Sequence, residues 1–428
     1  MAYLGENYRG LAVQENVPDT VEAMLFNALQ KTCLITDTKT CHYSRCGRTD
    51  KGVSAWGQVV AVHMRSNLKE GVEFVATEKD APSASTTADQ LPLSDCTVSQ
   101  NTLSASPTSP IASAATTCSS STITTASCSS SSSPSSSLST ASGNPNAREL
   151  DYVQMLNRVL PFDIRVLAWA PVDADFSARF SCAGRVYKYF FLKRDLDIDR
   201  MREASQLLVG EHDFRNFCKM DVVHVSNFVR EIRDFTIEPC SPHNCDQPTS
   251  LWVATISGTA FLYHQIRCMM QILFEVGARL EECDVVKTML DVEVTKNKPQ
   301  YPLASEVGLV LWDCQFPSLQ WSSTVEAQRL LMAKLLEVYE DRIIKSTMVG
   351  AMRAHLQTEM LFSSLHSSGR TAHNVRWKDM EEPPQKRKYV PLMQRDTEPH
   401  FEQRVESLSE SKKLKRDSNL KKGGEMRR

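Results

Sequence analysis

A long segment dominated by serine and threonine interrupts the chain and most constrains how it can fold. Residues 76–147 contain hardly any large apolar side chains, and residues 129–137 are almost pure serine. Such a segment cannot bury enough apolar surface to offset the entropy lost on ordering. We therefore expect a disordered insertion that leaves from a surface turn, since closing a longer loop costs little additional entropy. The folded material on either side then belongs to one interrupted domain.

Charge and cysteine content narrow the class of protein. The 428 residues carry a formal net charge of −2, so nucleic-acid binding must depend on local basic patches. No apolar run is long enough to span a bilayer and no secretory signal is present, so we expect an intracellular protein without a membrane partner. The 13 scattered cysteines predict reduced thiols. Cys240, His243 and Cys245 lack a second matched pair, so we predict a loop there and no zinc site.

Periodic patterns divide the folded part into two domains. Thr20 is placed to cap an amphipathic helix that begins at Val21. Further patterns predict a strand over 58–65, a helix over 150–160 that ends at Pro161, and a strand over 164–172. Helices that alternate with half-exposed strands are typical of an open sheet with helices packed on one face. We predict a first domain over 1–75 and 148–172, and a second over 173–321.

A strand over 185–191 carries an unusual face in the second domain. Alternation places Arg185, Tyr187, Tyr189 and Phe191 on one side of this strand. One interpretation is a cross-strand aromatic ladder that stabilises the sheet. The other is a platform on which an unpaired nucleobase stacks, because aromatic sheet faces commonly hold RNA bases. The residues alone leave both interpretations open.

A second unusual residue is Arg267, in the apolar helical stretch predicted over 261–280 after a strand over 251–258. Arg267 is near the start of this helix, where the macrodipole disfavours a cation, and no acidic residue follows or precedes it by three or four positions. Its partner must therefore be distant in sequence. Arg267 either extends its head into water or meets a carboxylate or phosphate in a cleft.

The run from Cys46 to Ala55 places one carboxylate, Asp50, among cations and between Gly47 and Gly52. The two glycines permit unusual backbone conformations and close approach of a ligand. We expect the neighbouring cations Arg45, Arg48 and Lys51 to lower the pKa of Asp50. A phosphate-binding loop is excluded, because Val53 stands where that motif needs lysine. A hairpin turn with a surface ion pair and an active-site loop both remain open.

Several ordered motifs resemble one enzyme family. GRTDKGVSA is followed by GQVVAVHMRS, and then come SARFSCAGRVYKYFF, EHDFRNFCKMD, SGTAFLYHQIRCMM and ASEVGLVLWDCQF. In this order they resemble the tRNA pseudouridine synthases that modify the anticodon stem-loop, over the chain from Tyr3 to about Trp321. The segments RCGRTDKGVSA, FCKMD and FLYHQIRCMM are most similar to the eukaryotic subfamily that acts at positions 38 and 39 of tRNA.

The resemblance implies roles for matching residues. Asp50 matches the catalytic aspartate that attacks a flipped uridine or its ribose, so that the glycosidic bond re-forms from nitrogen to carbon. Tyr187 matches the tyrosine that packs on the target base, and Arg267 the basic residue paired with the aspartate. Arg48 matches the arginine that fills the space left by the flipped base, and Leu309 an apolar residue that closes the pocket. The reaction needs no metal and no cofactor.

The resemblance also implies a fold and a substrate. We expect an α+β protein of two ferredoxin-like or RRM-like halves, with mainly antiparallel sheets that meet at a basic central cleft. The partner is tRNA, and a homodimer stays open. Candidate RNA-binding side chains are Arg45, Arg48, Lys51, Arg65, Arg185 and Lys188. Each of them alone is more typical of a solvated surface charge than of an RNA contact, so the prediction depends on their convergence in space.

The C-terminal part completes the prediction. Residues 322–370 have the apolar spacing of a helical extension, and residues 371–428 have the composition of a disordered basic tail. Lys386-Arg387-Lys388 and the cluster over 412–416 are typical of nuclear import signals or RNA contacts, or of a solvated tail. We expect a protein of nucleus and cytoplasm. Two alternatives to the proposed enzyme are a relative that modifies other uridines and an inactive RNA-binding relative.

Overall fold

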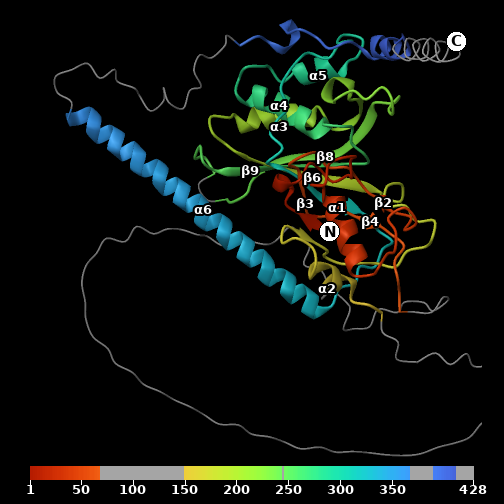
Figure 1. Cartoon of the computed structure of the whole chain (residues 1–428). Helices are drawn as coiled ribbons and strands as arrows, with labels where there is room; N and C mark the ends of the chain where they lie inside the picture. The colour runs from red at the N-terminus through yellow and green to blue at the C-terminus, as the bar shows by residue number, and fades with distance from the viewer. Residues whose placement is uncertain (68–148, 243–244, 367–388, 411–428) are drawn as a thin grey trace, which may run out of the picture.

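One eight-stranded sheet organises the chain in a computed structural model that describes residues 1–67, 149–242, 245–366 and 389–410 (Figure 1). Its strand order is β5-β1-β3-β10-β6-β9-β8-β7, and all neighbours are antiparallel except β3 and β10. The strands are β1 (Ala2–Tyr3), β3 (Ser54–Ala55), β5 (Ile164–Arg165), β6 (Gly184–Leu192), β7 (Gly210–Asp213), β8 (Val229–Pro239), β9 (Leu251–Gly258) and β10 (Leu309–Gln315). The mixed α+β class and the mainly antiparallel sheet are confirmed.

The N-terminal half contains α1 (Val21–Lys31), α2 (Tyr152–Asn157), the 3-10 helix η1 (Gly5–Asn7) and a small sheet of β2 (Ser44–Arg45) and β4 (Val60–Ala61). The predicted cap is confirmed, because the Thr20 side chain accepts a hydrogen bond from the Ala23 amide. The strands predicted over 58–65 and 164–172 are present as β4 and β5 but are shorter than expected. His63 and Arg65 donate their amides to loop carbonyls, and the Asn157 side chain bonds both backbone groups of Val166. These bonds replace a sheet ladder.

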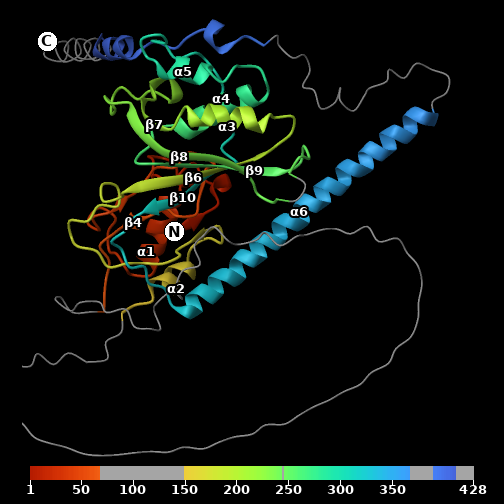
Figure 2. The same ribbon diagram turned by 180° about the vertical axis from the view of Figure 1, so that it is seen from behind.

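The C-terminal half has helices on one side of its strands. In Figures 1 and 2, α3 (Ile198–Gln206), α4 (Gln265–Gly277) and α5 (Val285–Leu290) lie together beside β6, β8 and β9. The strands predicted over 185–191 and 251–258 are confirmed as β6 and β9. The predicted helix over 261–280 is shorter, because His264 adopts a left-handed conformation, with φ of 65°, immediately before α4.

The last strand, β10, connects the two halves. It pairs with β3 from the N-terminal half and with β6 from the C-terminal half, so that Leu311 lies opposite both Ala55 and Tyr187. Leu309 belongs to the hydrophobic core under α3 and α4, whereas Leu311 belongs to the core around α1 and α2. The two cores therefore meet across β10, and the loops that precede β3, α4 and β10 converge there.

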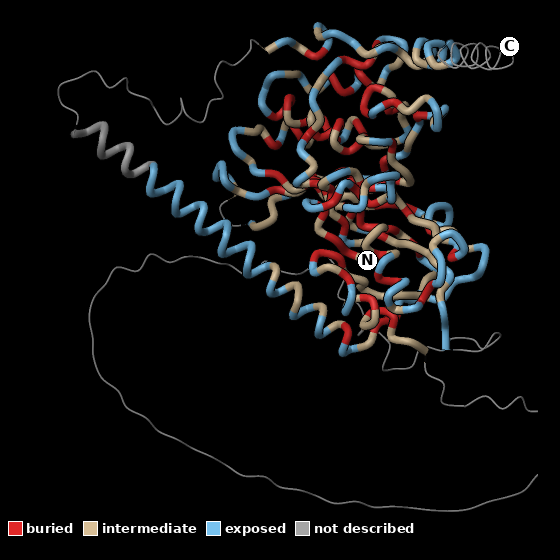
Figure 3. The backbone as a smooth tube through the Cα atoms, in the orientation of Figure 1, coloured by how far each residue is buried: buried red, intermediate tan, exposed pale blue. Residues whose placement is uncertain are grey.

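A helix of 42 residues, α6 (Val325–His366), follows the core and extends away from it (Figure 3). The predicted helical character of this region is confirmed. Every residue from Tyr339 to Leu356 is exposed. Within the described ranges, no helix is both long and apolar enough to cross a membrane.

The C-terminal tail departs from the prediction. Residues 389–410, which include η3 (Leu392–Gln394), pack on the C-terminal half, so the expectation of a disordered tail is wrong for this part. Leu392 is fully buried, and Tyr389 and Arg395 both hydrogen-bond the carboxylate of Glu275 on α4. Composition could not reveal this, because a few specific contacts anchor a mostly polar segment. The predicted insertion over 76–147 and both basic clusters lie outside the described residues.

Candidate active site

The loop that carries Asp50 is held by the N-terminal half. The Thr49 hydroxyl lies 2.7 Å from the Tyr3 hydroxyl, and the Gly52 amide donates to the Tyr8 carbonyl at 3.2 Å. Gly52 has a φ of +78°, and a Cβ atom there would lie 2.7 Å from Cγ of Glu306. Gly52 is therefore required both by backbone conformation and by space. Asp50 has a fixed position rather than a place on a free surface turn.

Asp50 is partly buried, with 20% of its side chain exposed. Burial raises its pKa from 3.8 to about 6, the nearby charges of Arg267 and Lys219 oppose this rise, and Glu306 adds to it. The predicted lowering of the pKa is therefore wrong. Arg48 and Lys51 are exposed, so water screens their charges. Desolvation of the carboxylate raises the pKa of Asp50 by more than the charges of Arg267 and Lys219 lower it.

Arg267 has the distant partner that its sequence context predicted, but this partner is Glu306. Its guanidinium donates to the Ala304 carbonyl at 2.7 Å and to the Glu306 carboxylate at 2.8 Å, and the side chain is only 12% exposed. The pairing expected with Asp50 is not a direct ion pair here. Arg267 nevertheless lies close enough that, of the groups lowering the pKa of Asp50, its charge has the largest effect.

His264 contacts the Asp50 carboxylate and was not predicted from the sequence. Its Nε2 atom lies 3.3 Å from Oδ2 of Asp50. Burial, together with the charges of Arg267 and Lys219, lowers the pKa of His264 to about 4, so the imidazole is neutral at pH 7. Its Nδ1 atom is buried and has no hydrogen-bond partner among the described residues. The only signal in the sequence was its position just before the helix that carries Arg267.

The aromatic face of β6 divides between the core and the site. Tyr189 and Phe191 pack edge-on against Phe274 of α4, as a structural aromatic cluster requires. Tyr187 is half-buried, lies edge-on to Phe261 with ring centroids 5.1 Å apart, and places its hydroxyl 3.9 Å from where a Cβ atom of Gly47 would be. Tyr187 thus lies against the Asp50 loop.

Leu309 is buried on β10 opposite Tyr189, whose hydroxyl donates to the Ser305 carbonyl at 2.7 Å. This contact and the bonds of Arg267 hold residues 304–306 in place. Leu309 therefore lies in the C-terminal core, and its amide donates to the carbonyl of Glu306, the partner of Arg267.

The predicted basic residues do not all converge. Arg48 and Lys51 are exposed on the Asp50 loop, and Arg65 is exposed farther along the chain. Arg45 instead pairs with the buried Glu22. Arg185 is buried and donates to the carbonyls of Thr259, Cys46 and Arg179. Lys188 lies on the opposite face of β6, with its ammonium 4.2 Å from the centre of the Trp312 ring. Only Arg48 and Lys51 combine exposure with a place on the Asp50 loop.

The arrangement suits chemistry at a single carboxylate. A partly buried Asp50 contacts a neutral imidazole and lies near a guanidinium, and a half-buried tyrosine packs against the loop that carries Asp50. Within the described ranges, no three His, Cys, Asp or Glu side chains gather in a geometry that could hold a metal ion. His243, which was considered for a zinc site, lies outside the described residues.

Comparisons with known proteins agree on one family. A family model described as tRNA pseudouridine synthase matches residues 204–317. The human tRNA pseudouridine(38/39) synthase is 38% identical over 84% of this chain, which spans 63% of the human protein's length. The mouse protein of the same name is 35% identical over 95% of the chain and 75% of its own length. A Caenorhabditis elegans protein named as a probable tRNA pseudouridine synthase is 33% identical, with 98% and 90% covered.

Proposed function

The chain belongs to the tRNA pseudouridine synthase family, and we propose that it isomerises uridine to pseudouridine in tRNA, at positions 38 and 39 of the anticodon stem-loop. The position of Asp50 carries this proposal. A carboxylate that is partly buried, held by a constrained loop and near His264 and Arg267, with Tyr187 packed against that loop, has the setting of a reactive group. The substrate positions are those in the names of the human and mouse relatives.

Asp50 acts as the nucleophile in this proposal. The carboxylate forms a bond with the base or the ribose, the bond between the ribose and the uracil nitrogen breaks, and a bond from the ribose to a uracil carbon forms. The bond to Asp50 is broken in turn, which returns the free carboxylate. That carbon loses its proton and the freed nitrogen gains one, so atoms and electrons balance without an oxidant. With a pKa of about 6, Asp50 is mostly ionised at pH 7 and ready to attack.

The neighbours of Asp50 have distinct parts in the proposal. Arg267 keeps the carboxylate ionised in a site where burial favours the protonated form. Tyr187 packs against the uracil while it rotates, and Leu309 excludes water from one side. The target base must first leave its stack, at a cost of a few kcal/mol. Arg48, exposed on the Asp50 loop, would occupy the space that the base leaves, and Lys51 would contact the RNA backbone.

The proposal includes a finer description of the fold and assembly. We take the two cores that meet at β10 as two ferredoxin-like halves, with a basic cleft between them.

A homodimer is supported by exposed apolar side chains on α6, among them Leu336, Tyr339 and Ile343. Light scattering of the purified chain tests this assembly. Location in nucleus and cytoplasm rests on the basic clusters alone, and microscopy of a tagged chain with those clusters replaced tests it.

A direct assay tests the activity. Purified protein is incubated with unmodified tRNA transcripts, and pseudouridine is mapped by carbodiimide treatment and primer extension, for the wild type and for Asp50→Ala. We expect modification at positions 38 and 39 by the wild type alone. Absence of activity in the wild type would favour an inactive RNA-binding relative, and signals at other uridines would favour a different specificity. Equal activity in both proteins would remove Asp50 from the mechanism.

A further inference from the structure

Two exposed side chains near Asp50, Tyr263 and Lys219, have no role in the proposed reaction. The Tyr263 ring lies 3.9 Å from the His264 ring, centroid to centroid, and His264 contacts Asp50. The Lys219 ammonium lies 5.4 Å from the centre of the Tyr263 ring, and its charge lowers the pKa of Asp50. A continuous path of contacts thus leads from the partly buried carboxylate to an exposed tyrosine and an exposed lysine.

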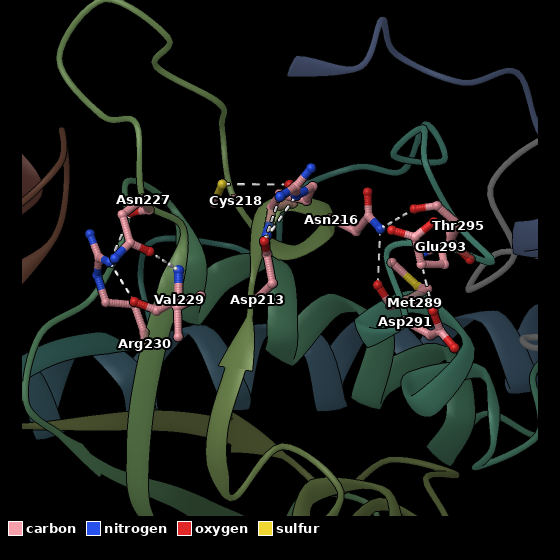
Figure 4. A network of polar contacts seen from close by, with 11 residues as sticks. Asp213, Asn216, Cys218, Asn227, Val229, Arg230, Met289, Asp291, Glu293 and Thr295 are labelled. Carbon is pink, nitrogen blue, oxygen red and sulfur yellow. Dashed lines mark hydrogen bonds and ion pairs between the residues drawn. The ribbon is translucent and has the colours of Figure 1, made fainter. Parts of the chain in front are cut away.

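The loop that carries Lys219 is firmly anchored (Figure 4). Asn216, in the 3-10 helix η2 (Arg215–Phe217), is fully buried and donates to the carbonyls of Met289 at 2.9 Å and Thr295 at 2.7 Å. Phe217 and Cys218 are also fully buried. The Lys219 amide donates to the Tyr263 carbonyl at 2.9 Å, which joins the two loops directly. Both side chains therefore leave from a rigid backbone, so a ligand that binds them pays little ordering entropy.

Exposure and charge leave both groups available to a ligand. Tyr263 is 49% exposed, whereas His264 beneath it has only 11% of its side chain exposed. Within the part of the chain that the structure describes, Lys219 makes no ion pair with a carboxylate. Contact between an exposed lysine and an aromatic ring is worth only about 0.5–1 kcal/mol. This small energy does not explain why the large ring of Tyr263 is exposed to water near Asp50.

An exposed aromatic ring next to an unpaired cation is the combination that binds one nucleotide of single-stranded RNA. The ring stacks on the base, and the cation meets the phosphate. A uridine extruded into the Asp50 pocket necessarily draws its chain neighbours toward the rim. The span from Asp50 through His264 to Tyr263 is made of directly contacting side chains, so the neighbouring base can reach the ring while the uridine reaches Asp50.

We propose that Tyr263 and Lys219 form a subsite for the nucleotide next to the extruded uridine, with its base stacked on Tyr263 and its phosphate paired with Lys219. The subsite rests on the proposed function, since it assumes that RNA is the substrate. The subsite binds the RNA strand where the extruded uridine leaves the stacked bases. It thereby stabilises the extruded state before any bond is broken, and it contributes to binding rather than to the chemical step.

Binding of an anticodon stem-loop RNA tests the subsite separately from the activity. All variants carry Asp50→Asn, so that affinity is measured without turnover. We expect Tyr263→Ala to raise the Kd by roughly 5- to 150-fold, the range for loss of one stacked base. We expect Lys219→Met to reduce the slope of log affinity against log salt by about 0.7 to 1. Tyr263→Phe and Lys219→Arg keep ring and charge and should restore binding.

Matched controls come from equally exposed residues away from the site. Phe162, in the turn before β5, is 54% exposed, and the Lys287 side chain on α5 is 64% exposed. Phe162→Ala and Lys287→Met should leave the affinity within about twofold of the parent protein. Losses in these controls equal to those at Tyr263 and Lys219 would overturn the subsite, because they would reflect general surface effects.

An RNA with one base removed identifies the stacking partner. The anticodon stem-loop is prepared with an abasic nucleotide immediately before or immediately after the target uridine. One of the two should bind the parent protein more weakly than intact RNA, and Tyr263→Ala should abolish that difference. An equal loss of affinity for intact and abasic RNAs would overturn the stacking contact. In the active protein, Tyr263→Ala should raise KM and leave kcat within about twofold.

The two proposals fail in different ways. If the wild type binds RNA but forms no pseudouridine, the enzyme activity is wrong while the subsite can still be confirmed by the binding series. If the wild type is active and neither Tyr263→Ala nor Lys219→Met changes affinity, KM or the salt slope, the subsite is wrong and the activity stands.

Discussion

His264 and Asp50 lie 3.3 Å apart, Nε2 to Oδ2, yet their protonation at neutral pH makes the contact a polar one rather than an ion pair. A mutual charge pair would raise the pKa of the imidazole and lower that of the carboxylate. Instead the pKa of His264 falls to about 4 and that of Asp50 rises to about 6, and burial is the largest cause of both shifts. At pH 7 a neutral imidazole therefore faces an ionised carboxylate.

This protonation state predicts an acid limit to the activity. The proposed reaction needs the ionised form of Asp50, whose pKa is about 6. We expect kcat/KM to be constant near pH 7 to 8 and to fall about tenfold per pH unit well below pH 6. Single-turnover rates over pH 4.5 to 8 measure this. An activity unchanged down to pH 5 would contradict the assignment of the raised pKa to the nucleophile.

Two substitutions should move this acid limit in opposite directions. Arg267 lowers the pKa of Asp50 and Glu306 raises it. Arg267→Met should therefore shift the limit upward by roughly one pH unit, and Glu306→Gln should shift it downward by less. Each substitution breaks the same 2.8 Å pair, so a purely structural effect would act equally in both. Shifts of the same sign would contradict the electrostatic account.

Asp50→Asn should remove activity and stabilise the fold. The pKa of Asp50 is higher in the folded chain than the ordinary 3.8, so the folded state binds the proton more readily. Stability therefore falls as pH rises from about 4 to 6, and the loss is complete above pH 6. The substitution should raise the free energy of unfolding by about 3 kcal/mol at pH 7. Urea unfolding at pH 7 and pH 4 measures this, and the gain should vanish at the lower pH.

Gly52→Ala tests the shape of the Asp50 loop. The positive φ and the 2.7 Å approach to Glu306 should cost about 2 kcal/mol of stability and reduce activity. Gly350→Ala on α6 is the matched control, because nothing lies within 4 Å of its Cβ position. That control should stabilise the protein by about 0.5–1 kcal/mol through helix propensity. Equal effects of the two substitutions would contradict the described loop geometry.

The ordered tail segment predicts a specific loss of stability. Arg395 and Glu275 form an ion pair in which the side chains are 15% and 8% exposed. Arg395→Met leaves the Glu275 carboxylate buried with fewer partners and should cost about 3 kcal/mol. Arg404 pairs with the more exposed Glu398, and Arg404→Met should cost under about 1 kcal/mol. Adding Glu275→Gln to Arg395→Met should recover part of the loss, as measured by urea unfolding.

Local patterns predicted much of the fold because their physical causes are local. The cap at Thr20, the strands β6 and β9 and the existence of α4 follow from side-chain periodicity and capping chemistry. The short strands near Val60 and Ile164 were predicted too long, since their outer residues bond to side chains and loops that no local pattern reveals. The tail segment around Leu392 was missed for the same reason.

The sequence by itself determined that Asp50 stands in a glycine-flanked loop, that Tyr187 lies on a strand, and that Arg267 needs a distant partner. Only the tertiary structure decided that this partner is Glu306, that His264 contacts Asp50, and that the pKa of Asp50 rises. Spacing along a chain fixes which residues share an element. Burial and the distance between charges from different elements decide protonation, and both arise only when the loops before β3, α4 and β10 are brought together.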